Sequence, residues 1–323
     1  VVDKTSLKNT IFASMEGLSV LIPVYCDSCV EQVMALVSQC QGLDMQWEIV
    51  VADDGSPSPY DALNDDIANW SGCRLIKRPI NVGRAAIRNF LAHEARFDTL
   101  LYIDAGMMPS DGFINRFVAS IGKAMVVCGS IGVKSDCVDR SNLRCLNEIK
   151  AINNHSYMKS NMNPYLDFHS GNFMIDRQTM LNNPFRENIK TYGYEDTLFG
   201  RDLSDSHISV THIDNPLLFV RFESNMRFLE KTEEAMRTLY AYRKELKGYS
   251  ALLHLVDGMQ RLHLLWITVW ISRLTRKRII KSLLGDSPGI LMFNIYRICC
   301  LSECYRKDGI LYTRKYANPD NSE

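Results

Sequence analysis

The sequence predicts an α/β fold in which a mostly parallel sheet is flanked by helices. Short apolar runs alternate with segments of helical spacing over the first 130 residues. This alternation is typical of parallel sheets that are covered by helices on both faces. Hydrophobic residues make up 46% of the 323-residue chain and charged residues 23%. This balance excludes a disordered, collagen-like or low-complexity protein.

The expected elements follow in order along the chain. Strands are predicted at 18–25, 47–52, 74–77, 99–103, 125–128 and 208–213. Helices are predicted at 30–41, 59–70, 83–96, 113–123 and 224–247. A polar, turn-rich stretch covers roughly residues 136–184, and the chain from 252 onward is predicted to be helical and basic.

The overall charge balance hides a strong asymmetry. The formal net charge is zero, so the surface as a whole is not built to bind nucleic acid. Between Arg261 and Lys315, however, eleven Lys or Arg stand against three Asp or Glu. Two tryptophans one turn apart precede basic residues that share a helix face: Trp266, Trp270, Arg273, Lys277 and Lys281. Such a helix either lies on an anionic membrane surface or packs on the main domain of the chain with its basic side in water.

The cysteines and the N-terminus bear on the compartment. Ten cysteines in a chain of this length are too sparse for a disulfide scaffold, and their spacing matches no zinc site. The first 17 residues lack the apolar core of a signal peptide. These features favour a cytoplasmic protein. The basic stretch suggests, in addition, a peripheral position on the inner face of the cell membrane.

Polar side chains end three of the predicted strands. Pro23 and Tyr25 end the first, Asp53 and Asp54 the second, and Asp104 the fourth. Ligands of open α/β sheets bind beyond the carboxyl ends of the strands, so these groups are expected to line one crevice. The alternative is that the Asp-Asp-Gly-Ser segment is only a turn. Neither a dinucleotide-binding glycine pattern nor a phosphate-binding loop occurs in the sequence.

Several motifs, in this order, resemble family 2 glycosyltransferases of the GT-A fold. The N-terminal ones are Ser19-Val-Leu-Ile-Pro-Val-Tyr25, Glu48-Ile-Val-Val-Ala-Asp-Asp-Gly-Ser56, Asn81-Val-Gly-Arg-Ala-Ala-Ile-Arg-Asn89 and Tyr102-Ile-Asp104. Gly193-Tyr-Glu-Asp-Thr-Leu-Phe-Gly200 is similar to the acceptor-side motif, and His212-Ile-Asp-Asn-Pro216 resembles a segment of bacterial members. The resemblance covers about residues 18–247.

The resemblance implies a domain plan and an activity. The GT-A domain would span 18–247, with a Rossmann-like nucleotide-binding half at 18–130 and an acceptor half at 131–247. An N-terminal extension would occupy 1–17, and a basic helical C-terminal extension 248–323. The implied activity is transfer of a sugar from a nucleotide-diphosphate sugar to a glycan or lipid-linked acceptor. The expected donor is a UDP-linked sugar.

Donor-binding roles follow from chemistry and resemblance together. Tyr25, which Pro23 precedes in the motif, could stack on the base. A carboxylate at Asp53 or Asp54 could accept from the N3–H of a uracil ring, and the resemblance favours Asp53. The remaining donor-side residues are expected to meet the diphosphate: Arg84, Arg88 and Asp104. The two arginines lie four residues apart on one helix face, and guanidinium groups match phosphate geometry.

Acceptor-side roles come from the later motifs. The resemblance implies an inverting single displacement in which Asp196 is the base and Glu195 binds the acceptor hydroxyl. The alternative is that both acids only charge a helix N-terminus. Gly171 and Asn172 resemble the loop beside the sugar, with an ordinary tight turn as the alternative.

One motif departs from the family pattern. The family normally has Asp-x-Asp after the fourth strand, where it holds Mn²⁺ or Mg²⁺, but this chain has Asp104-Ala105-Gly106. A histidine that related bacterial sequences place about four residues after Asn215 is Phe219 here. His212 is a remaining candidate ligand, with a structural role as its alternative.

The departure leaves three readings open. Asp104 could bind a metal weakly, or Arg84, Arg88 or Arg221 could neutralise the diphosphate without one. In the third, the chain keeps nucleotide or partner binding and has lost turnover. A nucleotidyltransferase on a similar sheet ranks lower, because no glycine-rich loop follows the first strand.

Overall fold

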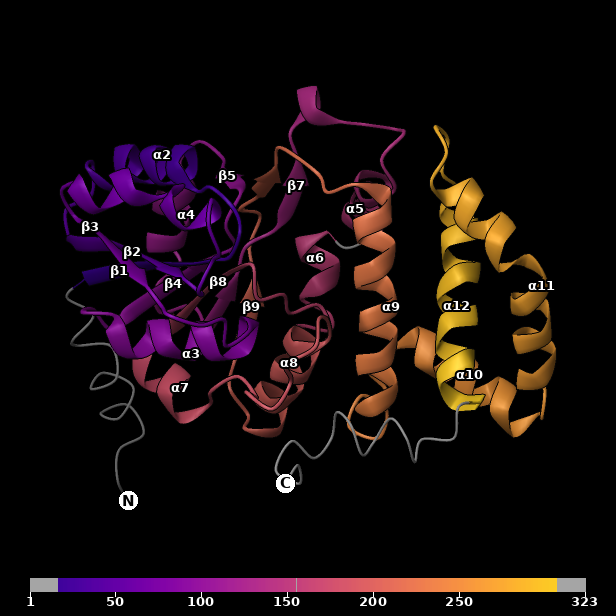
Figure 1. Ribbon diagram of the computed structural model, residues 1–323. Coiled ribbons are helices and arrows are strands. Elements are labelled where there is room, and N and C mark those ends of the chain that lie inside the picture. Colours follow the sequence, from indigo (N-terminus) through magenta and orange to yellow (C-terminus); the bar gives the residue numbers. More distant parts are fainter. Residues whose placement is uncertain (1–16, 155, 307–323) are drawn as a thin grey trace, which may run out of the picture. The chain divides into compact units, whose positions relative to one another are not determined.

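The computed structural model describes residues 17–154 and 156–306 and divides into two compact units (Figure 1). Among the described residues, the first unit comprises 17–134, 156–187 and 199–221. The second comprises 135–154, 188–198 and 222–306.

The first unit holds every strand found in the described part of the chain, together with the helices that cover these strands. Its strands are β1 (Gly17–Val24), β2 (Gln46–Asp53), β3 (Cys73–Lys77), β4 (Thr99–Ile103), β5 (Met107–Pro109), β6 (Val126–Cys128), β7 (Ile131–Val133), β8 (Asn172–Asp176), β9 (Val210–His212) and β10 (Leu217–Phe219). Its helices are α2 (Val30–Cys40), α3 (Arg84–Glu94), α4 (Phe113–Val118), α6 (Tyr157–Ser160) and α7 (Arg177–Asn182).

A seven-stranded sheet forms the centre of this unit. The strand order is β3-β2-β1-β4-β8-β6-β9. Only β8 runs antiparallel to its neighbours β4 and β6. The predicted mostly parallel sheet is thus confirmed. Three short strands form a second sheet in the order β5-β10-β7.

Helices cover both faces of the large sheet (Figure 1). On one face, Val20, Ile22 and Leu101 pack with Val33 of α2 and Phe117 of α4. The residues between them in sequence point to the other face and pack on α3 and α7. Burial on both faces explains why β1 and β4 are continuous apolar runs rather than alternating ones.

The second unit is helical. It contains α5 (Leu143–Asn154), α9 (Asn225–Ala241), α10 (Ala251–Arg261), α11 (Leu265–Leu283) and α12 (Ile290–Arg306). Helix α8 (Glu195–Asp205) is divided, with its first four residues in this unit and the rest in the first. A core of residues such as Leu239, Leu283 and Tyr296 joins α9, α11 and α12. None of the helices within residues 17–154 and 156–306 combines the length and apolar character that crossing a membrane requires.

Two sequence expectations need correction. Residues 59–70 form two short 3₁₀ helices, Tyr60–Ala62 and Asp65–Asn69, rather than one α-helix. Only Ile67 of these residues is a fully buried apolar side chain, so no apolar stripe holds a continuous helix there. Gly17 begins β1 and does not belong to the expected N-terminal extension, whose other residues lie outside the described chain.

The helical C-terminal extension is confirmed up to Arg306, and residues 307–323 lie outside the described chain. The expected domain boundary at 247/248 stays a prediction. The two units are assembled from non-contiguous segments and do not test that boundary.

Candidate functional site

The carboxyl ends of β1 and β4 mark the point where the strand order reverses. From β1 the chain builds outward to β2 and β3, and then returns to place β4 on the other side of β1. Ligands of open α/β sheets bind at such a switch point. Tyr25, which is 49% exposed, and Asp27 follow β1, while Asp104 follows β4. Pro23 lies within β1, opposite Ala52 of β2.

Asp53 and Asp54 are both buried but have different partners. Asp53 Oδ1 accepts from the backbone N–H of Ser56 at 2.8 Å. Asp54 accepts from the backbone N–H groups of Val82 and Gly83, at 3.0 and 2.9 Å. Burial raises the pKa of the Asp54 carboxyl, and these two N–H groups partly offset the rise. Asp54 thereby fixes the entry to α3, which leaves Asp53 as the better candidate for contact with a base.

Asp104 is paired with both predicted arginines. Its Oδ1 accepts from Arg88 Nη2 at 2.5 Å and its Oδ2 from Arg84 Nη2 at 3.3 Å. Burial by itself would raise the pKa of the Asp104 carboxyl, but the two guanidinium groups outweigh it and lower the pKa to about 2. The acid is therefore ionised at neutral pH.

The two arginines differ in exposure. Arg84 exposes 44% of its side chain, whereas Arg88 exposes only 2%. Besides Asp104, Arg88 donates to the carbonyl oxygens of Arg84 and Ser170, at 2.9 and 3.3 Å. Arg88 holds the end of β4 against the loop before β8, so contact between Arg88 and a phosphate would require rearrangement. Arg84 is the one of the pair that a ligand could reach.

Gly171 and Asn172 lie next to Asp104. The Gly171 carbonyl accepts from the Asp104 N–H at 2.9 Å. A Cβ at Gly171 would lie 2.9 Å from Asp104 Oδ2, so the glycine allows this close approach. Asn172 is fully buried and its amide donates to the carbonyls of Ser130 and Asn215. The pair shapes the wall behind Asp104, and Asn172 lies beneath the surface.

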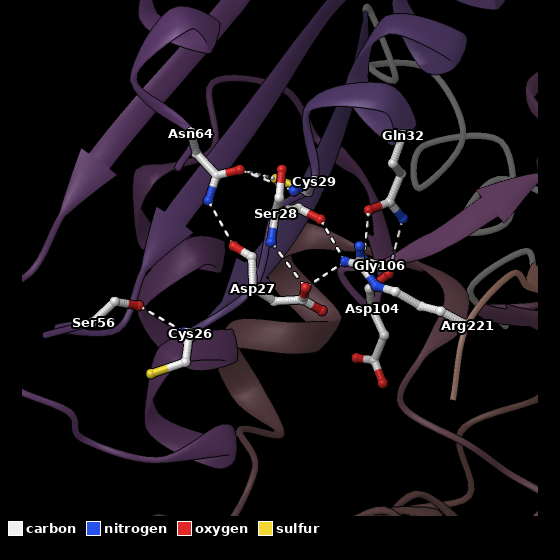
Figure 2. A network of polar contacts seen from close by, with 10 residues as sticks. All are labelled: Cys26, Asp27, Ser28, Cys29, Gln32, Ser56, Asn64, Asp104, Gly106 and Arg221. Atoms are coloured by element: carbon white, nitrogen blue, oxygen red, sulfur yellow. Dashed lines mark hydrogen bonds and ion pairs between the residues drawn. The ribbon is translucent and has the colours of Figure 1, made fainter. Parts of the chain in front are cut away.

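Two side chains at this site were not singled out from the sequence. The amide of Gln32, on α2, donates to the Asp104 carbonyl at 2.8 Å and accepts from the Gly106 N–H at 3.2 Å (Figure 2). Asp27 pairs with Arg221, which also donates to the Ser28 carbonyl at 2.8 Å. Two features of the sequence could have indicated them. Gln32 is a polar residue on the buried face of α2, and Asp27 is a further acid just after β1.

The residues at the switch point do not fit a divalent cation. Both oxygens of Asp104 are engaged by arginines. His212 lies on β9, at the far edge of the sheet from β3, and its Nε2 donates to the Pro164 carbonyl oxygen at 2.9 Å, so only Nδ1 keeps a lone pair. Within residues 17–154 and 156–306, no group of three or more His, Cys, Asp or Glu could hold a metal ion.

Glu195 and Asp196 begin α8 in the second unit. Two residues with positive φ precede them, Gly193 at +94° and Tyr194 at +67°. Glu195 is 6% exposed, and Asp196 is partly exposed, with Oδ1 accepting from the Thr197 N–H at 2.7 Å. The tight turn thus presents adjacent acids with different exposure, and Asp196 is the one that solvent reaches more easily.

Comparison with known proteins identifies the family. The model of a family described as glycosyl transferase family 2 matches residues 19–181, half of the chain. The chain belongs to glycosyl transferase family 2. The match covers β1 to α7 and therefore includes the switch point with Asp53, Arg84 and Asp104.

Individual relatives of this family 2 chain are distant. The undecaprenyl-phosphate 4-deoxy-4-formamido-L-arabinose transferase of Edwardsiella ictaluri (strain 93-146) is 28% identical over 130 residues, 37% of this chain. The match spans only 38% of that relative's length.

A solved structure supports the fold. The mannosyltransferase PcManGT from Pyrobaculum calidifontis, in complex with GDP-Man and Mn²⁺, superimposes with a TM-score of 0.55 at 13% identity, covering 90% of this chain and 87% of that one. The GT-A fold expected from the motifs is thereby confirmed. TarS 1-349 of S. aureus, in complex with UDP, reaches a TM-score of 0.47 at 15% identity over 90% of this chain and 91% of that one. A score below 0.5 does not decide the fold.

Proposed function

We propose that the chain is a glycosyltransferase that moves a sugar from a UDP-linked donor to a glycan or lipid-linked acceptor. The observation that carries the proposal is the group of residues at the switch point of a family 2 sheet: Asp53 at the end of β2, Tyr25 after β1, and Asp104 after β4, paired with Arg84 of α3. A nucleotide-diphosphate sugar needs its base gripped and its diphosphate neutralised, and these side chains can do both.

The base end of the donor belongs to β1 and β2. Val24 and Asp53 are register partners, so Tyr25 directly follows the residue that pairs with Asp53. The Tyr25 ring, half exposed, offers a face on which a pyrimidine can stack, and Asp53 can accept from its N3–H. A carboxylate recognises this donor group of uracil, which is why we assign a UDP-linked sugar.

The transfer step is assigned to the acids that begin α8. Asp196 takes the proton from the acceptor hydroxyl as its oxygen attacks the anomeric carbon. The bond from that carbon to the phosphate oxygen breaks as the new bond forms, and the nucleoside diphosphate leaves with the electron pair. Attack from the opposite face inverts the anomeric configuration. Glu195 binds the acceptor hydroxyl.

A lipid-linked acceptor is supported by the surface of α11. Its exposed side includes Trp266 and Trp270, 68% and 59% exposed, followed by exposed Arg273, Lys277 and Lys281. Aromatic rings next to a basic stripe suit an anionic membrane surface. The relative from Edwardsiella ictaluri is named for transfer to undecaprenyl phosphate, a lipid carrier. The proposed location is the cytoplasmic membrane surface.

The test compares Asp196→Asn with Asp205→Asn, a control acid at the far end of the same helix. UDP formation from UDP-sugars should fall about 10²–10⁴-fold in Asp196→Asn. UDP binding by this variant should match that of the wild type. Asp205 exposes 61% of its side chain, and its variant should keep full activity. Equal rates for the two variants would show that Asp196 is not the base.

The second candidate is a chain that binds nucleotide without turnover. The replacement of the family's second acid by Gly106 favours it. UDP binding without UDP formation from any UDP-sugar, in the presence of polyprenyl-phosphate and glycan acceptors, would support this candidate over the enzyme.

A further inference from the structure

An ion pair occupies the space beside Gly106. Arg221 Nη2 donates to Asp27 Oδ1 and, at 2.8 Å, to the Ser28 carbonyl oxygen (Figure 2). A Cβ built at Gly106 would lie 2.6 Å from Asp27 Oδ2 and 3.0 Å from Arg221 Nη2. The φ of Gly106 is +76°, in the left-handed region that favours glycine. A side chain at position 106 is therefore excluded twice, by the backbone and by the pair.

The strand pairing explains how Arg221 reaches this place. β10 runs antiparallel to β5, and Phe219 lies opposite Met107, the residue after Gly106. The chain that leaves β10 therefore passes the turn at the end of β4. Phe219 and Gly106, the two positions where the sequence lacks an expected metal ligand, are thus neighbours, and an arginine follows them.

Arg221 is equipped to receive a phosphate. Its side chain is 54% exposed. Of the three nitrogens of the Arg221 guanidinium group, only Nη2 makes hydrogen bonds to described residues. Nη1 and Nε can therefore donate to a ligand while Asp27 holds the guanidinium group in place. A guanidinium offers two parallel donors to two phosphate oxygens.

The ion pairs at Asp104 and at Asp27 together hold one more cation than carboxylate. Three guanidinium groups, Arg84, Arg88 and Arg221, stand against the two carboxylates Asp104 and Asp27. A diphosphate brings negative charge to this place, and an excess of positive charge attracts it without further help. A metal bound at Asp104 would first have to displace two arginines.

We propose that Arg221, held by Asp27 beside Gly106, binds the donor's diphosphate in place of a divalent cation. This inference rests on the proposed function. It assigns phosphate binding to a side chain that the sequence separates from Asp27 by 194 positions. It also makes Asp27 a positioning residue, since it acts on the ligand only through Arg221.

The test is calorimetric titration of UDP and UMP into the full chain, with millimolar Mn²⁺ and separately with EDTA. The wild type should bind UDP with the same affinity in both conditions, within about twofold. Arg221→Met should weaken UDP binding about tenfold or more in both conditions, since a charge-assisted contact is lost. UMP binding, which presents less charge, should change less. Arg221→Lys keeps the positive charge but lacks the two parallel donors of a guanidinium group, so its UDP affinity should lie between those of the wild type and Arg221→Met.

Arg96→Met is the matched control. Arg96 exposes 65% of its side chain and pairs with Glu48, and it lies just before β4, at the opposite edge of the sheet. Its UDP affinity should equal that of the wild type, within about twofold. Asp27→Asn tests the rival role of Asp27 as a metal ligand, because a ligand's loss would weaken UDP binding in Mn²⁺ but not in EDTA.

Three other outcomes would contradict either the role of Arg221 or the proposed function. Wild-type binding that needs Mn²⁺ and vanishes in EDTA would overturn the inference and leave the proposed function standing. Unchanged UDP affinity in a folded Arg221→Met would also overturn it. If UDP, GDP and dTDP all fail to bind under either condition, the proposed function fails and the inference with it.

Discussion

Adjacent acids at the end of β2 have separate duties. Asp54 accepts two backbone N–H groups and fixes the start of α3, whereas Asp53 is the register partner of Val24 and accepts from the Ser56 N–H. Their chemistry alone left them interchangeable, because both follow the same apolar run, and only the family resemblance favoured Asp53. Which of them contacts the start of the helix depends on the path of the chain near residue 82, which is 28 positions after Asp54.

Alanine at each position should separate the two roles. Asp54→Ala leaves the N–H groups of Val82 and Gly83 without their acceptor, and should lower the free energy of unfolding by about 3 kcal/mol. Asp53→Ala should weaken UDP binding about tenfold. Denaturant unfolding and calorimetry measure the two effects. A reversed pattern, with Asp53→Ala less stable and Asp54→Ala defective in binding, would exchange the assignments.

The Asp104 ion pairs predict a pH dependence of stability. The folded-state pKa is about 2 and the unfolded value about 3.9, so the stabilisation is fully present above pH 4 and is lost as pH falls toward 2. Asp104→Asn lacks this titration. The difference in unfolding free energy between wild type and variant should therefore be largest at pH 5 and shrink toward pH 2. A difference that is constant across this range would contradict the low pKa.

At the scale of elements, the strands of the large sheet other than β8 were predicted from the sequence, and the strands of the small sheet were not. The predicted strands 18–25 and 99–103 appear as β1 and β4, and the helix 83–96 as α3. The strands β5, β7 and β10 have three residues each, too few to carry a period. The second sheet, which delivers Arg221 to the site, was therefore invisible in the sequence.

Helix α2 supports the site through Gln32, which is 2% exposed. Gln32→Leu would leave the Asp104 carbonyl and the Gly106 N–H without their partner, at a cost of about 2 kcal/mol in the free energy of unfolding. Gln41→Leu, at an exposed position just after the same helix, should change stability by less than about 0.5 kcal/mol. Denaturant unfolding measures both effects. Equal effects would show that Gln32 does not stabilise the backbone at Asp104 and Gly106.

Helix α11 should bring the chain to anionic membranes. Flotation with phosphatidylglycerol-containing vesicles at low salt should recover the wild type, and Trp266→Ser combined with Trp270→Ser should reduce the bound fraction. Leu291→Ser combined with Ile295→Ser removes two exposed apolar side chains from α12 instead and serves as the control. Each basic residue near the surface contributes up to about 1 kcal/mol, so binding should weaken as salt rises. If the wild type does not float with these vesicles, α11 does not bind membranes. The alternative, a helix packed on the protein with its basic side in water, would then hold.

For the whole molecule, the sequence predicted which strands bear polar ends but not how those ends are connected. That Asp53, Asp104 and Arg84 lie at one sheet edge follows from parallel strands, and the motif order predicted it. The burial of Arg88 and the pairing of Asp27 with Arg221 are tertiary facts. They depend on contacts between distant segments, for which a single sequence carries no local signal.

The central claim is that the switch point binds a nucleotide-diphosphate sugar. Calorimetric titration of the full chain with UDP-, GDP- and dTDP-sugars, in EDTA, tests it most directly. We expect saturable one-to-one binding that is tightest for a UDP-sugar and that Asp53→Ala weakens about tenfold. Absence of binding by every donor, with Mn²⁺ as well as with EDTA, would show that the switch point is not a donor site.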